Sequence, residues 1–313
     1  MSIIAADNML QTILTKCRQR SCAHNHEQCM DCTYGDYCER NCEKCLDYIH
    51  FPSHAQKGAP ERKYDCTHMA DFYTCKYSCR YASEIVYAVK RCKRLATLSE
   101  VKVLSFGCGP CTDLLAIDYL HEQGALSYSK LEYRGIDYSQ MVWKHIHRDI
   151  KAFEDDERKI QFYYKDACEL ILDIARGNWT PDVIVFQYVF SDMKKHTDLQ
   201  QIQEFITIFA DYYNTKVQAG TYVILNDVNL STRYNGGRDF FDELYNKLKN
   251  SSCKKGRFCN DNSTSDYYPR GYPYGSEEFP CNANFFDIKQ WEDYSPFDTC
   301  ASAQMLICKG AGK

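Results

Sequence analysis

The stretch Val101-Lys-Val-Leu-Ser-Phe-Gly-Cys-Gly-Pro-Cys-Thr-Asp113 decides the fold that we expect for this chain. It contains a short run of β-branched and apolar residues, then a Gly-x-Gly turn, then a helix-like segment that starts near Leu114. Glycine lets the backbone turn sharply where a Cβ would clash, and the first N–H groups of the following helix are free to bind a ligand. The pattern therefore predicts a cofactor cradle at the end of a strand.

From this stretch toward the C-terminus, strand-like and helix-like segments alternate. Such alternation indicates an α/β fold with a mostly parallel sheet and helices on both faces. A tyrosine-rich region at about 250–296, with Tyr267, Tyr268, Tyr272 and Tyr274, departs from the pattern and is expected to be an irregular insert. The expected strands are 101–106, 131–136, 160–164, 183–188, 222–225 and 303–308. The expected helices are 113–121, 138–153, 167–175, 198–216 and 238–248.

Characteristic residues follow each of the first three expected strands. Gly107-Cys108-Gly109-Pro110 comes after the first, Asp137 after the second and Asp166-Ala167 after the third. Ligands of such sheets bind at the carboxyl ends of the strands. A carboxylate after the second strand is placed to bind both hydroxyls of a ribose, and an acid beside a small residue leaves room for an adenine ring. Together these residues predict a site for an adenosine-bearing ligand.

At these motifs the chain resembles the class I S-adenosylmethionine-dependent methyltransferases. Val103-Leu-Ser-Phe-Gly-Cys-Gly-Pro110 looks like their first motif, and Gly135-Ile-Asp-Tyr-Ser139 looks like their second. Asp166-Ala167 resembles the adenine-contacting pair, and Pro181-Asp-Val-Ile-Val-Phe-Gln-Tyr188 resembles the fourth strand. The resemblance covers roughly residues 80–309. It implies a Rossmann-like sheet of seven strands, with the seventh antiparallel beside the fifth.

The resemblance also implies the cofactor and its contacts. Ser105 stands where the family usually has an acid and Cys111 where it has a third glycine, so we expect Asp113 to take over the contact with the methionine amine. A dinucleotide dehydrogenase is disfavoured because Gly107-x-Gly109 lacks the following x-x-Gly. The cofactor-binding residues that we expect are Gly107, Cys108, Gly109, Pro110, Asp113, Asp137, Tyr138, Asp166, Ala167, Gln187 and Tyr188.

Candidate catalytic residues follow the fourth and fifth strands. Methyl transfer from a sulfonium is a direct displacement, so a site mainly aligns the acceptor and excludes water. Tyr188, Asp192 and Asp227 are the residues that we expect to act there. No Asn/Asp-Pro-Pro-Tyr run of the kind used to methylate amino groups of nucleic acids follows the fourth strand, and neither does a Pro-Cys pair.

The N-terminal segment has a different chemistry, because ten of the nineteen cysteines fall within the first 79 residues. Two Cys-x-x-Cys pairs, Cys29/Cys32 and Cys42/Cys45, have the spacing of tetrahedral metal sites. Reducing conditions favour metal ligation over disulfides. The expected ligands are Cys29, Cys32, Cys38, Cys42, Cys45, Cys66, Cys75 and Cys79.

Zinc is the metal that we expect, and an iron–sulfur cluster is the alternative. The run Cys38-x-x-x-Cys42-x-x-Cys45 has the spacing with which radical S-adenosylmethionine enzymes hold a [4Fe–4S] cluster, but the rest of the chain does not resemble their barrel. The predicted organisation is a cysteine-rich metal-binding module at 1–67 and a methyltransferase domain at 68–313, joined by a helix at 68–95. The module is expected to be a loop fold organised by the metal.

We expect methyl transfer to a macromolecular acceptor. RNA is the leading acceptor class, since small metal modules often present rigid polar surfaces to nucleic acid, and protein is the other. The net charge of -4 argues against binding by bulk electrostatics. The alternatives are aminocarboxypropyl transfer from the same cofactor and a catalytically silent cofactor-binding module. The N-terminus lacks the pattern of a secretory signal and no apolar run is long enough to span a bilayer, so we expect a cytoplasmic protein without a membrane partner.

Overall fold

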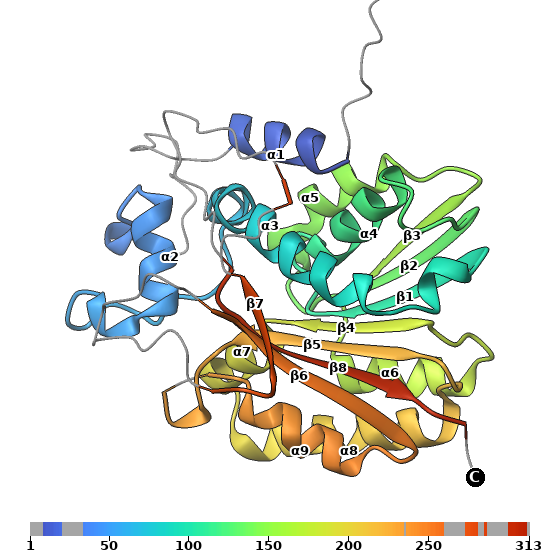
Figure 1. The fold of residues 1–313 in the computed structure, drawn as a ribbon. Coiled ribbons are helices and arrows are strands. Elements are labelled where there is room, and N and C mark those ends of the chain that lie inside the picture. The colour runs from blue at the N-terminus through green and yellow to red at the C-terminus, as the bar shows by residue number, and fades with distance from the viewer. Residues whose placement is uncertain are drawn as a thin grey trace, which may run out of the picture.

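The computed structural model describes residues 9–20, 34–234, 236–259, 273–280, 285–286 and 300–311. Within them lies one eight-stranded sheet in the order β3-β2-β1-β4-β5-β8-β6-β7 (Figure 1). Neighbouring strands from β3 to β5 are parallel, which confirms the expected mostly parallel sheet. The strands are β1 (Glu100–Phe106), β2 (Lys130–Ile136), β3 (Arg158–Tyr163), β4 (Val183–Gln187), β5 (Tyr222–Val228), β6 (Ser251–Cys259), β7 (Glu277–Pro280) and β8 (Ser302–Lys309).

The number of strands corrects the sequence-based expectation of seven. β8 lies antiparallel beside β5 as expected, but β6 and β7 occupy part of the region that was expected to be irregular. Gly256 permits the extra pairing, because a Cβ there would lie 2.7 Å from the carbonyl oxygen of Glu277, its partner in β7. Tyr267, Tyr268 and Tyr272 lie outside the described residues.

Two helical layers cover the sheet, as Figure 1 shows. One face carries α1 (Met9–Arg20), α3 (Thr67–Lys90), α4 (Thr112–Glu122) and α5 (Gln140–Lys151), and the other carries α6 (Ala167–Arg176), α7 (Val189–His196), α8 (Leu199–Lys216) and α9 (Asp239–Lys247). Each layer buries its own hydrophobic core against the sheet. In the described part of the chain, we find no helix with both the length and the apolar character needed to cross a membrane.

The cysteine-rich segment contains a helix that the sequence analysis did not predict. α2 (Cys42–His50) begins after Asn41, whose side chain accepts a hydrogen bond of 3.0 Å from the Lys44 N–H. Leu46 and Ile49 are each only 2% exposed, and they belong to the same core as α1 and α3. The segment after Tyr34 is therefore not a pure loop fold, since apolar packing against α3 also holds it.

The strand order places the functional site. The chain passes from β1 to β2 and β3 on one side, and then crosses to β4 and β5 on the other side. Between β1 and β4 the helical crossovers leave in opposite directions, and ligands of such sheets bind in the crevice outside the carboxyl ends of the strands at this point. Phe106 of β1 pairs with Phe186 of β4, so the next residues, Gly107 and Gln187, lie side by side at this edge of the sheet.

Candidate functional site

The turn after β1 has the backbone shape that the sequence predicted. Gly107 and Gly109 have φ angles of 58° and 44°, in the left-handed region that glycine adopts at little cost. A Cβ on Gly107 would also lie 2.9 Å from a methyl carbon of Val189. Cys111 has a φ of 57° and stands directly before α4, so the turn leads into a helix N-terminus. These residues form the cradle, which we define as Gly107 to Cys111.

Asp137 joins the cradle to the end of β2. The Gly109 N–H donates a hydrogen bond of 3.0 Å to Asp137 Oδ2, and the Ser139 N–H donates one of 2.9 Å to Oδ1. Burial raises the pKa of this carboxyl above its ordinary value, although both hydrogen bonds favour the charged form. An ionised carboxylate has about four acceptor positions, so two remain for hydroxyl groups of a ligand. The structure thus brings together the first two motifs singled out in the sequence.

Three other residues were expected to contact the adenosine: Asp166, Ala167 and Tyr138. The first two have structural roles at the start of α6, and the third is exposed. Asp166 is the N-cap of α6, and its Oδ1 accepts hydrogen bonds from the backbone N–H groups of Cys168 and Glu169 at 2.8 and 3.2 Å. Ala167 packs against the core beneath it. Tyr138 is 84% exposed directly after Asp137, so its ring is accessible to a ligand at the cradle.

Asp113 lies in the core instead of at the surface of the cradle. It is 2% exposed, and its Oδ1 accepts a hydrogen bond of 3.0 Å from the Tyr133 hydroxyl. Burial raises the pKa of this carboxyl. Its Oδ2 is buried without a hydrogen-bond partner among the described residues, and the expected contact with the methionine amine stays a prediction.

The side chains of two cradle cysteines meet a buried histidine of α5, which the sequence analysis did not identify. The sulfur atoms of Cys108 and Cys111 and an imidazole nitrogen of His147 all lie within 4.8 Å of one another, and all three residues are buried. His147 Nε2 is 2.7 Å from the Gly109 carbonyl oxygen, and Nδ1 is 2.9 Å from the Tyr164 hydroxyl. Burial raises the pKa of Cys111, but the hydrogen bond with Cys108 and the nearby imidazole outweigh it and hold that pKa below its ordinary value. The nearby Cys111 sulfur in turn helps to raise the pKa of His147, against the effect of burial, so the two side chains favour each other's charged forms.

Gln187 and Tyr188 end β4 beside the cradle. Gln187 Oε1 accepts a hydrogen bond of 2.6 Å from the Thr112 hydroxyl at the start of α4, and its Nε2 donates one of 2.8 Å to the Tyr81 carbonyl oxygen of α3. Tyr188 has a φ of 59°, and its ring stacks on Tyr81 with the centroids 4.1 Å apart. Gln187 thus ties together the helices that flank the crevice.

A buried glutamate organises the strand ends, and sequence reasoning missed it. Glu84 of α3 is 0% exposed, and its Oε2 accepts hydrogen bonds of 2.8 Å from both the Tyr188 hydroxyl and the Asn226 amide. Its Oε1 accepts one of 3.2 Å from the Ala301 N–H and lies 3.3 Å from Arg80 Nε. The one local signal in the sequence was that Arg80 and Glu84 are four residues apart, the spacing of an ion pair on one helix. Nothing in the sequence indicated that three strand ends converge on this pair.

An aromatic row on α3 leads away from Tyr188. Tyr73, Tyr77 and Tyr81 are spaced four residues apart, and successive ring centroids lie 4.8 and 5.2 Å apart. Trp143 of α5 contacts the far end of the row, 5.8 Å from Tyr73. Tyr77 and Tyr81 are each 8% exposed, so the rings of this row pack mainly against one another in the core between the helices and the sheet.

The two other candidate catalytic residues are Asp192 of α7, which begins directly after Tyr188, and Asp227 of β5. Asp192 of α7 has a half-exposed side chain, and one of its oxygens lies 3.6 Å from His196 Nε2. Asp227 of β5 is 1% exposed, and its oxygens accept hydrogen bonds from the N–H groups of Ser191 and Val228 at 2.9 and 2.6 Å. These bonds explain Asp227 as a link between β5 and α7, while a role as a base stays a prediction.

Asp227 predicts a specific pH dependence of stability. Burial raises its pKa to about 6 in the folded protein, whereas an unfolded chain has a value of about 4. Between these values the folded state holds a proton that the unfolded state has lost, so this group makes stability fall as pH rises from about 4 to about 6. The contribution is about 3 kcal/mol. In urea unfolding, the free energy of unfolding of the wild type should fall by this amount relative to that of Asp227→Asn as the pH rises from about 4 to about 6. Asp173→Asn, on the exposed surface of α6, is the control and should follow the wild type. Parallel curves would contradict the assignment.

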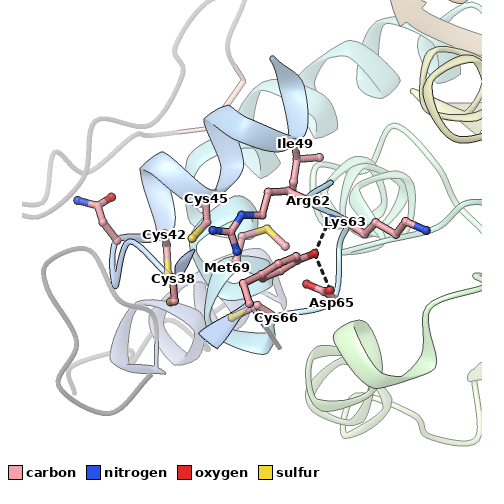
Figure 2. A pocket seen from close by; sticks show the side chains of 11 residues that line it. Cys38, Cys42, Cys45, Ile49, Arg62, Lys63, Asp65, Cys66 and Met69 are labelled. Atoms are coloured by element: carbon pink, nitrogen blue, oxygen red, sulfur yellow. Dashed lines mark hydrogen bonds between the residues drawn. The ribbon is translucent and has the colours of Figure 1, made fainter. Parts of the chain in front are cut away.

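The cysteines predicted to bind metal fall into separate places. Cys29 and Cys32 lie outside the described residues. Cys75 and Cys79 are buried in α3, and Cys75 Sγ donates to the Leu14 carbonyl oxygen of α1 at 3.7 Å. The remaining four line one pocket between α2 and α3, which Figure 2 shows; they are Cys38, Cys42, Cys45 and Cys66. The structure therefore brings together half of the expected ligands and separates Cys75 and Cys79 from them.

Comparisons with known proteins give similarity at the level of structure. No protein-family model and no curated protein sequence matches the chain. A plantazolicin methyltransferase, BpumL, solved with SAH, is 12% identical, with 97% of this chain and 100% of that chain covered and a TM-score of 0.43. A SAM-dependent methyltransferase from Agrobacterium tumefaciens is 11% identical, with 73% and 62% covered and a TM-score of 0.42. Magnesium protoporphyrin IX methyltransferase from Synechocystis PCC 6803, with bound SAM, is 12% identical, with 73% and 79% covered and a TM-score of 0.40. With identity and TM-score this low, we argue the function from the residues of this chain.

Proposed function

We propose that this protein binds S-adenosylmethionine in the cradle and transfers its methyl group to an acceptor held over the end of β4. The observation that carries the proposal is the hydrogen bond between the Gly109 N–H and Asp137 Oδ2, at the switch point of the parallel sheet. It fixes a glycine turn, a helix N-terminus and a carboxylate in the arrangement that an adenosine ligand needs. The residues fit the cofactor, because α4 begins directly after the cradle and Asp137 keeps acceptor positions for the ribose hydroxyls.

The chain's own residues position the reaction. Bound in the cradle, S-adenosylmethionine supplies an electrophilic methyl group. Gln187 links the interior of α3 to the start of α4, and Glu84 fixes the Tyr188 hydroxyl by accepting a hydrogen bond from it. Alignment and exclusion of water are the main requirements of a direct displacement. Asp192, with its half-exposed carboxylate, is the residue proposed to accept a proton where the acceptor must lose one.

RNA is the acceptor class that we propose. Lys194 and Lys195 lie next to His196 in the last turn of α7, and basic side chains of this kind commonly contact phosphate groups. This basic end of α7 supports an extended, anionic acceptor more than a small apolar one.

A labelling experiment tests the function. Purified protein is incubated with methyl-labelled S-adenosylmethionine and, in separate reactions, with total RNA, total protein and a small-metabolite extract. We expect label in the RNA fraction that nuclease releases and protease does not, and little label with Asp137→Ala. Asp173→Ala, which changes an exposed carboxylate of α6, is the matched control and should transfer label normally. A parallel reaction with label in the aminocarboxypropyl group identifies that alternative transfer. Cofactor binding without any transfer would contradict the proposed activity.

A further inference from the structure

Cys108 and Cys111 form a dithiol at the turn between β1 and α4. The Cys111 N–H donates a hydrogen bond of 2.7 Å to the Cys108 carbonyl oxygen, which closes Cys108-Gly-Pro-Cys111 into a tight turn. Such turns keep their first and fourth Cα atoms less than about 7 Å apart, which is within the reach of a disulfide. Both cysteines are free thiols in the structure, and their sulfur atoms lie within 4.8 Å of each other. The backbone therefore already brings the two cysteines within bridging distance.

Two features of the backbone accommodate this pair. Cys111 has a φ of 57°, a left-handed conformation that is unfavourable for a residue with a Cβ. Strained residues of this kind cluster at functional sites. Gly135 of β2 leaves space for the other sulfur, because a Cβ there would lie 2.9 Å from Cys108 Sγ. The chain thus holds one cysteine in a strained conformation and keeps room beside the sulfur of the other.

The position of His147 favours thiol chemistry over metal binding at this pair. Its Nε2 lies 2.7 Å from the Gly109 carbonyl oxygen and 3.7 Å from Cys108 Sγ. A carbonyl oxygen can only accept a hydrogen bond, so Nε2 carries a hydrogen and has no lone pair for a metal ion. The nitrogen that faces the sulfurs is thus a donor, which stabilises a thiolate beside it.

The surroundings of the two sulfurs give them different roles. Burial raises the pKa of Cys111, but the contact with Cys108 and the imidazole of His147 outweigh burial and lower it to about 7. Burial also raises the pKa of Cys108, and the neighbouring Cys111 raises it further. Cys111 therefore carries the nucleophilic thiolate, and Cys108 keeps its proton. The other titratable groups that face the pair are Asp113 of α4, Tyr133 of β2, Asp137 after β2 and Tyr164 after β3.

The burial of the pair favours a very small oxidant. Cys111 is 0% exposed and Cys108 is 5% exposed, while Gly107, directly before them, lies at the surface. Hydrogen peroxide is little larger than water, whereas a disulfide reagent must bring one of its sulfurs to the attacking thiolate. A thiolate of lowered pKa beside a second thiol is also the arrangement that peroxide converts to a disulfide through a sulfenic acid.

We propose that Cys108 and Cys111 are a site of reversible disulfide formation that hydrogen peroxide oxidises. The Cys111 thiolate attacks one oxygen of the peroxide, the O–O bond breaks, and the leaving hydroxide takes up the proton that Cys111 lost on ionising. The Cys108 sulfur then attacks the sulfenic acid on Cys111, and its proton leaves with the hydroxyl group as a second water. A dithiol reductant reverses the oxidation and is itself converted to a disulfide. This site goes beyond the proposed methyl transfer and does not depend on it.

Mass spectrometry of one peptide tests the site in the full-length protein. Cleavage after lysine and arginine releases residues 103–130, which contain Cys108 and Cys111 and no other cysteine. After reaction of the reduced wild type with peroxide and acid quenching, this peptide should be lighter by two hydrogen atoms and should resist alkylation. A dithiol reductant should restore both alkylation sites. Cys92→Ser, which removes another buried cysteine, is the matched control and should behave like the wild type. A peptide that stays alkylatable, or one that carries only sulfinic or sulfonic acid, would overturn the proposal, as would a stoichiometric metal ion lost in His147→Leu.

Single variants test the roles of the two cysteines and of His147. Cys108→Ser lacks the second thiol, so peroxide should leave a sulfenic acid on Cys111 that a cyclic 1,3-diketone traps. Cys111→Ser lacks the thiolate, so Cys108 should be oxidised roughly tenfold more slowly than the wild-type pair, or slower still. The wild-type rate should rise with pH around a midpoint of about 7, and His147→Leu should move this midpoint upward. Trapping on Cys108 in place of Cys111, or an unchanged midpoint without the imidazole, would contradict these roles.

Discussion

Replacing Glu84 by alanine should lower the free energy of unfolding by about 3–5 kcal/mol, the usual cost of breaking a buried ion pair from one side. The carboxylate is 0% exposed and accepts hydrogen bonds from Tyr188, Asn226 and Ala301 while it faces Arg80. Its removal would leave the Arg80 guanidinium without this counter-charge and several donors without an acceptor. Urea unfolding followed by circular dichroism measures the change.

Two further variants make this prediction specific. Glu84→Gln keeps the shape but not the charge, and it should be destabilised by less than the alanine variant. Glu100→Ala removes a half-exposed glutamate of β1 and should change stability by no more than about 0.5 kcal/mol. If Glu84→Ala were as stable as Glu100→Ala, the strand ends would not depend on the buried carboxylate.

The second large effect concerns the cofactor. Asp137→Ala should weaken the binding of S-adenosylmethionine by about 1.5–3 kcal/mol, since a charged hydrogen-bond acceptor is lost. This energy corresponds to roughly ten- to a hundredfold in affinity. The substitution also frees the Gly109 N–H, so part of the loss reflects a less ordered cradle. Isothermal titration calorimetry with the cofactor measures the affinity directly.

Controls separate binding from folding in this experiment. Asp173→Ala should bind like wild type, because this side chain pairs with Lys165 on the exposed surface of α6. The unfolding transition of Asp137→Ala shows whether the variant is folded when its affinity is measured. A folded Asp137→Ala protein with unchanged affinity would mean that the cofactor does not lie in the cradle.

The central strands could be predicted from the sequence because they are buried on both faces. Val101, Val103, Leu104 and Phe106 of β1 are all at most 1% exposed, so the strand forms an apolar run that is visible locally. β6 shows no such run. Its residues Ser251–Cys259 are mostly polar, and they form a strand because β8 offers backbone partners along its length. β6 and β8 are far apart in the sequence, so the pattern of residues within β6 alone does not predict this pairing.

The same distinction applies to the functional residues. Asp137 was predictable beside the Gly-x-Gly turn because β1 and β2 are parallel and in register, with Phe106 opposite Ile136, so both strands end together. The hydrogen bond between Asp113 and Tyr133 was not predictable, because the position of Asp113 at the start of α4 says nothing about the direction of its side chain. Six described cysteines were expected to bind metal, but spacing along the chain does not reveal that Cys75 and Cys79 lie apart from Cys38, Cys42, Cys45 and Cys66.

The sequence by itself determined the parallel core, the cradle and the placement of Asp137, since each follows from local apolar runs and from the geometry of parallel strands. Only the tertiary structure decided that Glu84 meets Tyr188 and Asn226, that His147 lies beside Cys111, and that Arg62 is buried among cysteines. The physical reason is common to all three. The energy of a buried charge depends on the groups around it, and those groups come from segments far apart in the chain.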